Sequence, residues 1–188
     1  MALPFFAHWR KARQQMRKAT DFVAVLLREP SDADTAWLSG AATRGDEDHA
    51  RWELRYARRA VGLLVAQRDA LDDRTGSLVA EALTAAFEAD QRIDRARFGL
   101  VERQFNARVS DYRDAMAARS ADGSLRLGQT MLAFAGGSFR DVDDTVRRAS
   151  DVIAGYETEA NDALRAVFGS ASLPEHVPPS AVADRAST

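Results

Sequence analysis

The chain has 188 residues, of which 46% are hydrophobic and 29% are charged, so it is long enough to bury the core of one domain. It has no cysteine, which excludes disulfides, zinc–thiolate sites, iron–sulfur clusters and cysteine nucleophiles. A net charge of −2 argues against nucleic-acid binding, although residues 1–30 alone carry +4. No apolar run approaches the ~20 residues that cross a bilayer. We therefore expect a cytoplasmic protein without a transmembrane segment.

The first predicted helix covers residues 4–28 and ends before Pro30. Alternating steps of four and three residues place its apolar residues on one face: Phe5, Trp9, Ala12, Met16, Ala19, Val23 and Leu26. Its other faces carry five bases: Arg10, Lys11, Arg13, Arg17 and Lys18.

The regular spacing of this helix favours packing inside a bundle with the bases outward. A basic amphipathic helix with aromatic residues can also lie on an anionic membrane or dock in the groove of a partner. Phe5, Trp9 and the five bases are therefore candidate contact residues.

The next two helices are marked by their first residues. Ser31 to Asp34 resembles a capping box and predicts a short helix through Trp37 and Leu38, followed by a loop over residues 40–45. A long helix is predicted from Asp46 to a break at residues 72–76. We expect the rest of the chain to fold around this helix, because its apolar face is wide: Ala50, Leu54, Ala57, Val61, Leu64, Arg68 and Leu71, with Trp52, Tyr56, Ala60 and Leu63 beside them.

Three further long helices and one short one follow. Apolar stripes predict helices over residues 77–90 and 94–119, and a short helix over 124–135. A last long helix is predicted from Ser138, with Asp141 as its capping partner, to Gly169. We expect a single all-α domain over residues 1–169, formed by a mostly antiparallel bundle of four to five amphipathic helices, with a disordered C-terminal tail over residues 170–188.

One candidate metal site lies near the start of the helix that begins at Asp46. His49 and Glu53 are four residues apart, so they share a helix face and could both reach one divalent ion. The alternative is that acids gather at a helix N-terminus because the helix dipole favours them there. No histidine has a glutamate three residues before it, as a ferritin-like site requires. We therefore expect no cofactor.

Other charged residues suggest a ligand pocket or ordinary ion pairs. Arg68 occupies a core position, where it either reaches the rim of the bundle or marks a polar pocket with a carboxylate partner such as Asp69 or Asp72. Tyr56 and Arg68 are therefore candidate ligand-binding residues. The run Arg55, Arg58 and Arg59 is expected to be solvated on the face opposite the core. In the last helix we expect four-residue pairs: Asp143 with Arg147, and Asp144 with Arg148.

No serine-nucleophile, P-loop or dinucleotide-binding motif is present in the sequence. The sequence therefore favours a non-catalytic protein–protein interaction or assembly module, either a homodimer formed through the last helix or a complex with another helical protein. Peripheral membrane association through residues 4–28 is one alternative. A small-molecule or metal-binding bundle, with a site near His49 and Tyr56, is the other.

Overall fold

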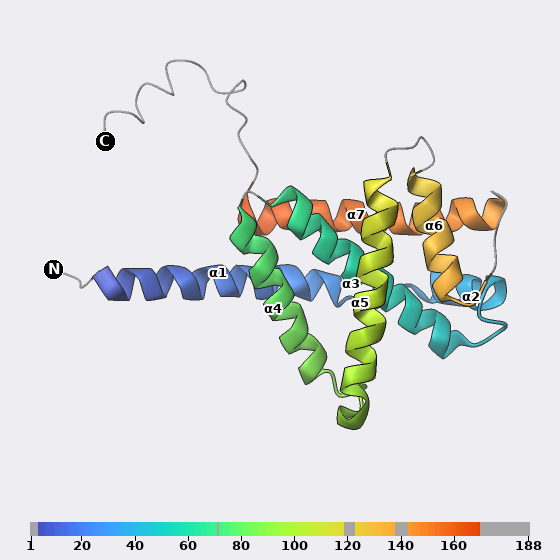
Figure 1. Cartoon of the computed structure of the whole chain (residues 1–188), viewed down its shortest axis with the longest axis horizontal. Helices are drawn as coiled ribbons and strands as arrows, with labels where there is room; N and C mark the ends of the chain where they lie inside the picture. The colour runs from blue at the N-terminus through green and yellow to red at the C-terminus, as the bar shows by residue number, and fades with distance from the viewer. Residues whose placement is uncertain (1–3, 71, 119–122, 138–142, 170–188) are drawn as a thin grey trace, which may run out of the picture.

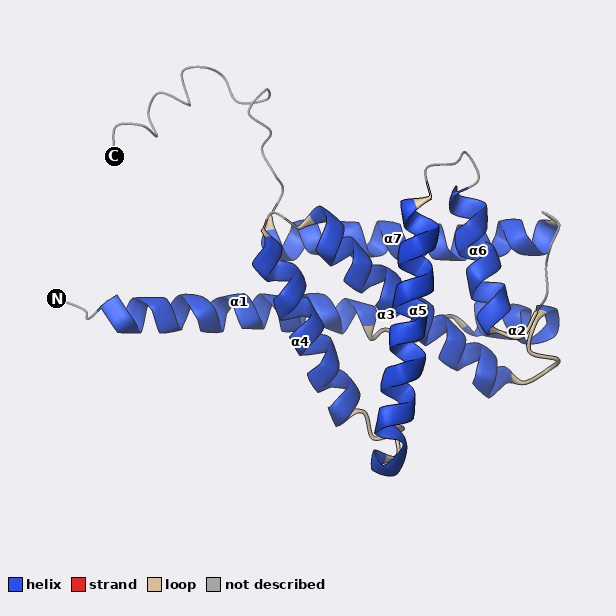
Figure 2. Ribbon diagram, in the orientation of Figure 1, coloured by secondary structure: helices blue, strands red, loops and turns tan. Residues whose placement is uncertain are grey.

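The computed structural model describes residues 4–70, 72–118, 123–137 and 143–169, and within these ranges it contains α-helices and no strand (Figure 2). This confirms the all-α class. The described ranges contain seven α-helices, five long and two short, with a short 3-10 helix, η1 (Arg95–Arg97), before the fifth; a bundle of four to five of them is not confirmed. Their bounds are α1 (Pro4–Leu26), α2 (Asp32–Ala41), α3 (Glu47–Asp69), α4 (Asp73–Ala89), α5 (Phe98–Ala117), α6 (Gly123–Phe134) and α7 (Asp144–Phe168).

The helices cross one another in layers. α1 and α7 pack side by side, while α4, α5 and α6 run across them (Figure 1). α3 lies in the middle and contacts all six other α-helices, as its wide apolar face predicts. The predicted antiparallel bundle is not confirmed, because the crossing helices meet their neighbours over only part of their length.

Side-chain caps begin most helices. Ser31 accepts the amide of Asp34 at 3.0 Å, which confirms it as the N-cap of α2, while the Asp34 carboxylate accepts the hydroxyl of Ser31 and not its amide, as a full capping box would require. Asp46 likewise accepts the amide of His49 at 2.9 Å. α4 begins earlier than predicted, because Asp72 accepts both the amide and the hydroxyl of Thr75. The predicted break at residues 72–76 is therefore the first turn of α4.

The start of α7 differs from the predicted pairing pattern. Asp143 caps the helix by accepting the amide of Val146 at 2.9 Å. Arg147 pairs with Asp144, while Arg148 stacks over Trp37 of α2 at 4.7 Å. Both predicted four-residue pairs are therefore wrong, because the cap and the aromatic ring take their partners. Ser138, Asp141, Leu71 and the tail over residues 170–188 lie outside the described residues.

α1 divides into two halves with different surroundings. Ala19, Phe22, Val23 and Leu26 are buried against α4 and α7. The first half projects beyond the rest of the molecule (Figure 1), and the side chain of Trp9 is 52% exposed. The expectation that this stripe packs into the bundle along its whole length therefore holds only for the second half. The side chain of Phe5 lies outside the described part of the chain.

In the ranges that the structure describes, every helix is too short or too polar to cross a lipid bilayer.

Candidate functional site: an arginine network, a cleft and a groove

The arginines of α3 lie inside the protein. Arg55 and Arg59 are buried, and the Arg58 side chain is only 14% exposed. Arg58 donates to the backbone carbonyls of Arg28 and Glu29 at 2.8 and 3.3 Å, and Arg55 donates to the Glu29 carboxylate at 2.6 Å. The predicted solvated basic face is therefore wrong. Arg55 and Arg58 instead hold the segment that follows α1, through the carboxylate of Glu29 and the carbonyls of Arg28 and Glu29.

Arg59 is the least satisfied member of this network. Its guanidinium lies over the Phe87 ring at 4.9 Å, and its nitrogen atoms have no hydrogen-bond partner among the described residues. The nearest carboxylate, that of Asp90, is 3.9 Å away and accepts hydrogen bonds from Arg92. These bonds lower the pKa of Asp90, while burial lowers the pKa of Arg59 to about 10.

A cleft of about 410 Å³ lies between the first half of α3, the loop before α5, and α5 itself. The structure brings three of the predicted site residues together here: His49, Glu53 and Tyr56. The rest of the lining combines an aromatic side chain with polar, charged and aliphatic ones: Trp52, Arg92, Ile93, Asp94, Arg97, Leu100, Val101, Gln104 and Arg108. Trp52 and Tyr56 lie against each other, with ring centroids 5.7 Å apart.

The carboxylate of Glu53 is already occupied. Arg108 of α5 donates to both of its oxygen atoms, one of them at 2.8 Å through Nε, and the pair is buried. The guanidinium is held between the rings of Tyr56 and Phe134, at 4.7 and 4.4 Å. His49 approaches Glu53 at 3.5 Å. A metal ion bound by His49 and Glu53 would have to displace Arg108.

The described residues contain no group of three or more His, Asp or Glu side chains arranged for a metal. The cleft therefore combines an aromatic wall with the closed Glu53–Arg108 ion pair, and its other carboxylate, that of Asp94, accepts the amide of Ala96. The Glu53–Arg108 pair joins residues 55 positions apart, and no local spacing in the sequence could have indicated it.

Arg68 lies apart from the cleft, at the end of α3. It pairs with Asp69 and reaches Glu157 of α7 at 2.8 Å, and these hydrogen bonds raise its pKa. Its side chain is half exposed, so it reaches the rim of the helical core instead of forming a pocket with Tyr56.

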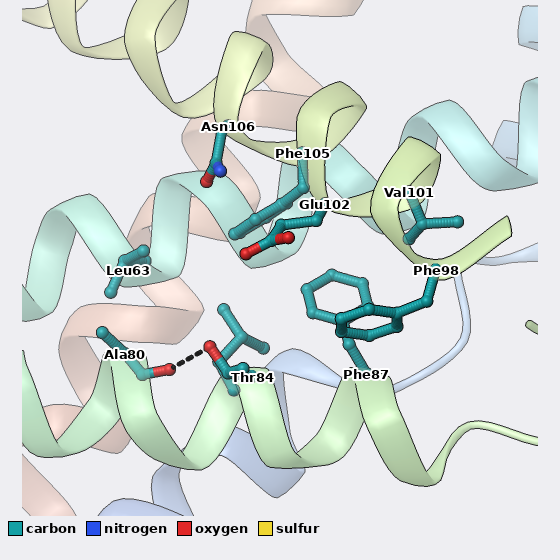
Figure 3. Close-up of a pocket in the computed structure, with 10 residues that line it drawn as sticks. Leu63, Ala80, Thr84, Phe87, Phe98, Val101, Glu102, Phe105 and Asn106 are labelled. Carbon is teal, nitrogen blue, oxygen red and sulfur yellow. Dashed lines mark hydrogen bonds between the residues drawn. The ribbon is translucent and has the colours of Figure 1, made fainter. Parts of the chain in front are cut away.

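A second hollow, the α4–α5 groove, opens between α4 and α5, with Leu63 of α3 at its floor (Figure 3). The backbones of α4 and α5 approach each other at few points. Phe87 and Phe105 meet across the groove, with centroids 4.9 Å apart. The groove holds about 120 Å³, and its lining is mainly apolar with a polar rim: Leu63, Ala80, Leu83, Phe87, Phe98, Val101 and Phe105, with Thr84, Glu102 and Asn106.

Except for Ala80, these apolar residues belong to the stripes that predict the helices, but a stripe does not indicate how far apart α4 and α5 lie. By contrast, the projecting half of α1 presents an apolar helix face that lines no groove. Its Trp9 contacts Arg13, whose guanidinium lies 5.0 Å from the ring. Residues 4–20 contain five bases and no acid. Lys18, at the boundary with the packed half, lies over Phe168 at 5.8 Å.

A scan against protein-family models and searches of curated proteins and of solved structures gave no match.

Proposed function

We propose that this protein is a non-catalytic interaction module whose docking element is the projecting half of α1. One observation carries the proposal: a basic amphipathic helix extends beyond the protein with Trp9 exposed. Trp9, Ala12 and Met16 share one face of this helix, and Ala12 and Met16 are only partly buried.

The projecting half of α1 gains little stabilisation from packing against its own protein. Isolated helices of about 12–15 residues are marginal in water, and most helical stability in proteins comes from packing an apolar face. A partner that covers Trp9 would supply that packing. Tryptophan and arginine are also the residues that most often dominate binding energy at interfaces.

α7 is a less suitable docking surface than α1. Its stripe is buried against α1, α3 and α6, and among the described residues the only exposed large hydrophobic side chains are those of Trp9 and Leu100. The structure therefore gives no support to a homodimer formed through the last helix. The occupied carboxylate of Glu53 in the cleft likewise favours a non-catalytic role.

Site-specific photo-crosslinking in cells tests the proposal. Benzoylphenylalanine replaces Trp9 in one variant and Ala24, an exposed residue on the packed half of α1, in a matched control. We expect a discrete adduct from position 9 and none from position 24, because only position 9 lies on the docking face. An equal yield at both positions, or no adduct at position 9, would contradict the proposal.

A further inference from the structure

We infer that the partner of α1 is a second copy of this chain, with Trp9 of one copy inserted in the α4–α5 groove of the next. The inference rests on the proposed function and names its partner. The chain carries both halves of such a contact: an amphipathic helix with an exposed tryptophan on its apolar face, and an apolar groove between two helices whose backbones approach at few points.

The size and lining of the groove suit one edge of an aromatic side chain. An apolar cavity of about 150 Å³ holds a benzene molecule, so the groove, at about 120 Å³, can hold part of the indole ring while the rest stays at its rim. Phe87, Phe98 and Phe105 line it (Figure 3). Aromatic rings at such distances attract one another edge to face or in offset stacks.

The residue spacing on α1, α4 and α5 also fits a contact between the helix of one copy and the groove of another. Trp9, Ala12 and Met16 follow one another at steps of three and four residues. The walls of the groove repeat these steps: Ala80, Leu83, Thr84 and Phe87 on α4, and Phe98, Val101, Glu102, Phe105 and Asn106 on α5. A helix laid between α4 and α5 would thus meet side chains on successive turns of both, as in helix-in-groove recognition.

The charge distribution along the chain also favours a second copy as the partner of α1. The five bases of residues 4–20, taken from the chain's 26, leave 21 bases against 28 acids, so the remainder of the chain has a net charge of −7. Glu102 is the one charged side chain that lines the groove, and an adjoining hollow adds Glu88 and Arg95, which offset each other. The basic helix of one copy is therefore attracted to the body of another.

The helix cannot fill the groove of its own copy. The second half of α1 is fixed against α4 and α7, and the first half extends away from α5 (Figure 1). The contact is therefore head-to-tail, between two different surfaces. Such a contact closes into a ring or continues into a chain of copies, depending on the rotation between neighbours.

Sedimentation velocity over a range of protein concentrations tests the inference. We expect the wild-type chain to associate, and Trp9→Ala to weaken association about 30-fold, the effect of losing an interface residue worth about 2 kcal/mol. Glu102→Lys should also weaken it, because a base at the rim repels the bases of α1. Asp111→Lys is the matched control, since Asp111 is exposed on α5 outside the groove; its association should exceed that of Glu102→Lys.

Mixing the two weakened variants gives the decisive result. The Trp9→Ala copy keeps an intact groove and the Glu102→Lys copy keeps an intact helix, so together they should form a 1:1 complex that neither forms alone. A wild-type chain that stays monomeric, a mixture that does not associate, or equal effects of Glu102→Lys and Asp111→Lys would overturn the inference.

The proposed docking role of α1 does not depend on a second copy being its partner. If the chain stays monomeric but sediments with phosphatidylglycerol vesicles in a Trp9-dependent manner, or crosslinks through position 9 to a different protein, α1 is still the docking element and only the second copy is ruled out.

Discussion

Two buried arginines differ in how well the neighbouring groups compensate their charge. Arg108 shares two hydrogen bonds with Glu53 and lies between two aromatic rings, so its charge is compensated. Arg59 is buried to 1% exposure, stacks on Phe87, and has no hydrogen bond among the described residues. Burying a charge costs free energy unless ion pairing and hydrogen bonding offset the lost hydration.

The two arginines should therefore respond differently to the same substitution. Arg108→Met leaves the buried Glu53 carboxylate with only His49 beside it, 3.5 Å away, and we expect it to lower the free energy of unfolding by about 3–5 kcal/mol. Arg59→Met removes a poorly compensated charge and keeps most of the packing, so the change should stay within about 1 kcal/mol or be stabilising. Urea denaturation measures both. Equal losses of unfolding free energy would contradict the conclusion that the charge of Arg59 is less well compensated than that of Arg108.

At the scale of the helices, local sequence predicted the elements better than their surroundings. Ser31 and Asp46 mark true helix starts because a cap depends on residues within one turn. The stripe of residues 4–28 correctly identified an apolar face, but periodicity does not say what covers that face. The same limit applies to α4 and α5, whose stripes line a groove in place of a closed interface.

In the candidate site too, neighbours within one helix could be predicted from the sequence, whereas contacts between helices could not. Helical spacing placed His49 and Glu53 on one face, and the structure shows that both line one cleft with Tyr56. Arg108 could not be predicted as the partner of Glu53, and the buried arginines of α3 could not be predicted to meet the end of α1. These contacts join residues distant in sequence and depend on how the helices cross.

Two glycines test the close packing of α6 on α7. A Cβ atom at Gly128 would lie 2.7 Å from the backbone nitrogen of Ser150 and the carbonyl of Val146, and backbone atoms cannot easily move away. We expect Gly128→Ala to cost about 2–3 kcal/mol of unfolding free energy by forcing the two helices apart. Gly155 of α7 has nothing within 4 Å of that position. Gly155→Ala should stabilise the protein by about 1 kcal/mol in the same thermal or urea measurement, and a comparable loss in both variants would contradict the assigned contact.

At the scale of the whole molecule, charge and apolar surface are divided between two parts. The body formed by α2 to α7 and the second half of α1 buries its apolar faces and holds the negative charge. The projecting half of α1 holds five bases and an exposed tryptophan. Docking through this half does not require the body to open, because the buried stripe of α1 begins only at Ala19.

The fluorescence of Trp9 tests this account most directly. In a Trp37→Phe, Trp52→Phe variant, with its helical content checked by circular dichroism, Trp9 is the only tryptophan and is excited apart from the tyrosines at long wavelength. In dilute solution, we predict the red-shifted emission of an indole in water and strong quenching by acrylamide. As the protein associates at higher concentration, the emission should shift to the blue and the quenching should weaken. Blue-shifted, shielded emission already at the lowest concentration would show that the first half of α1 packs on its own protein, and would contradict the account.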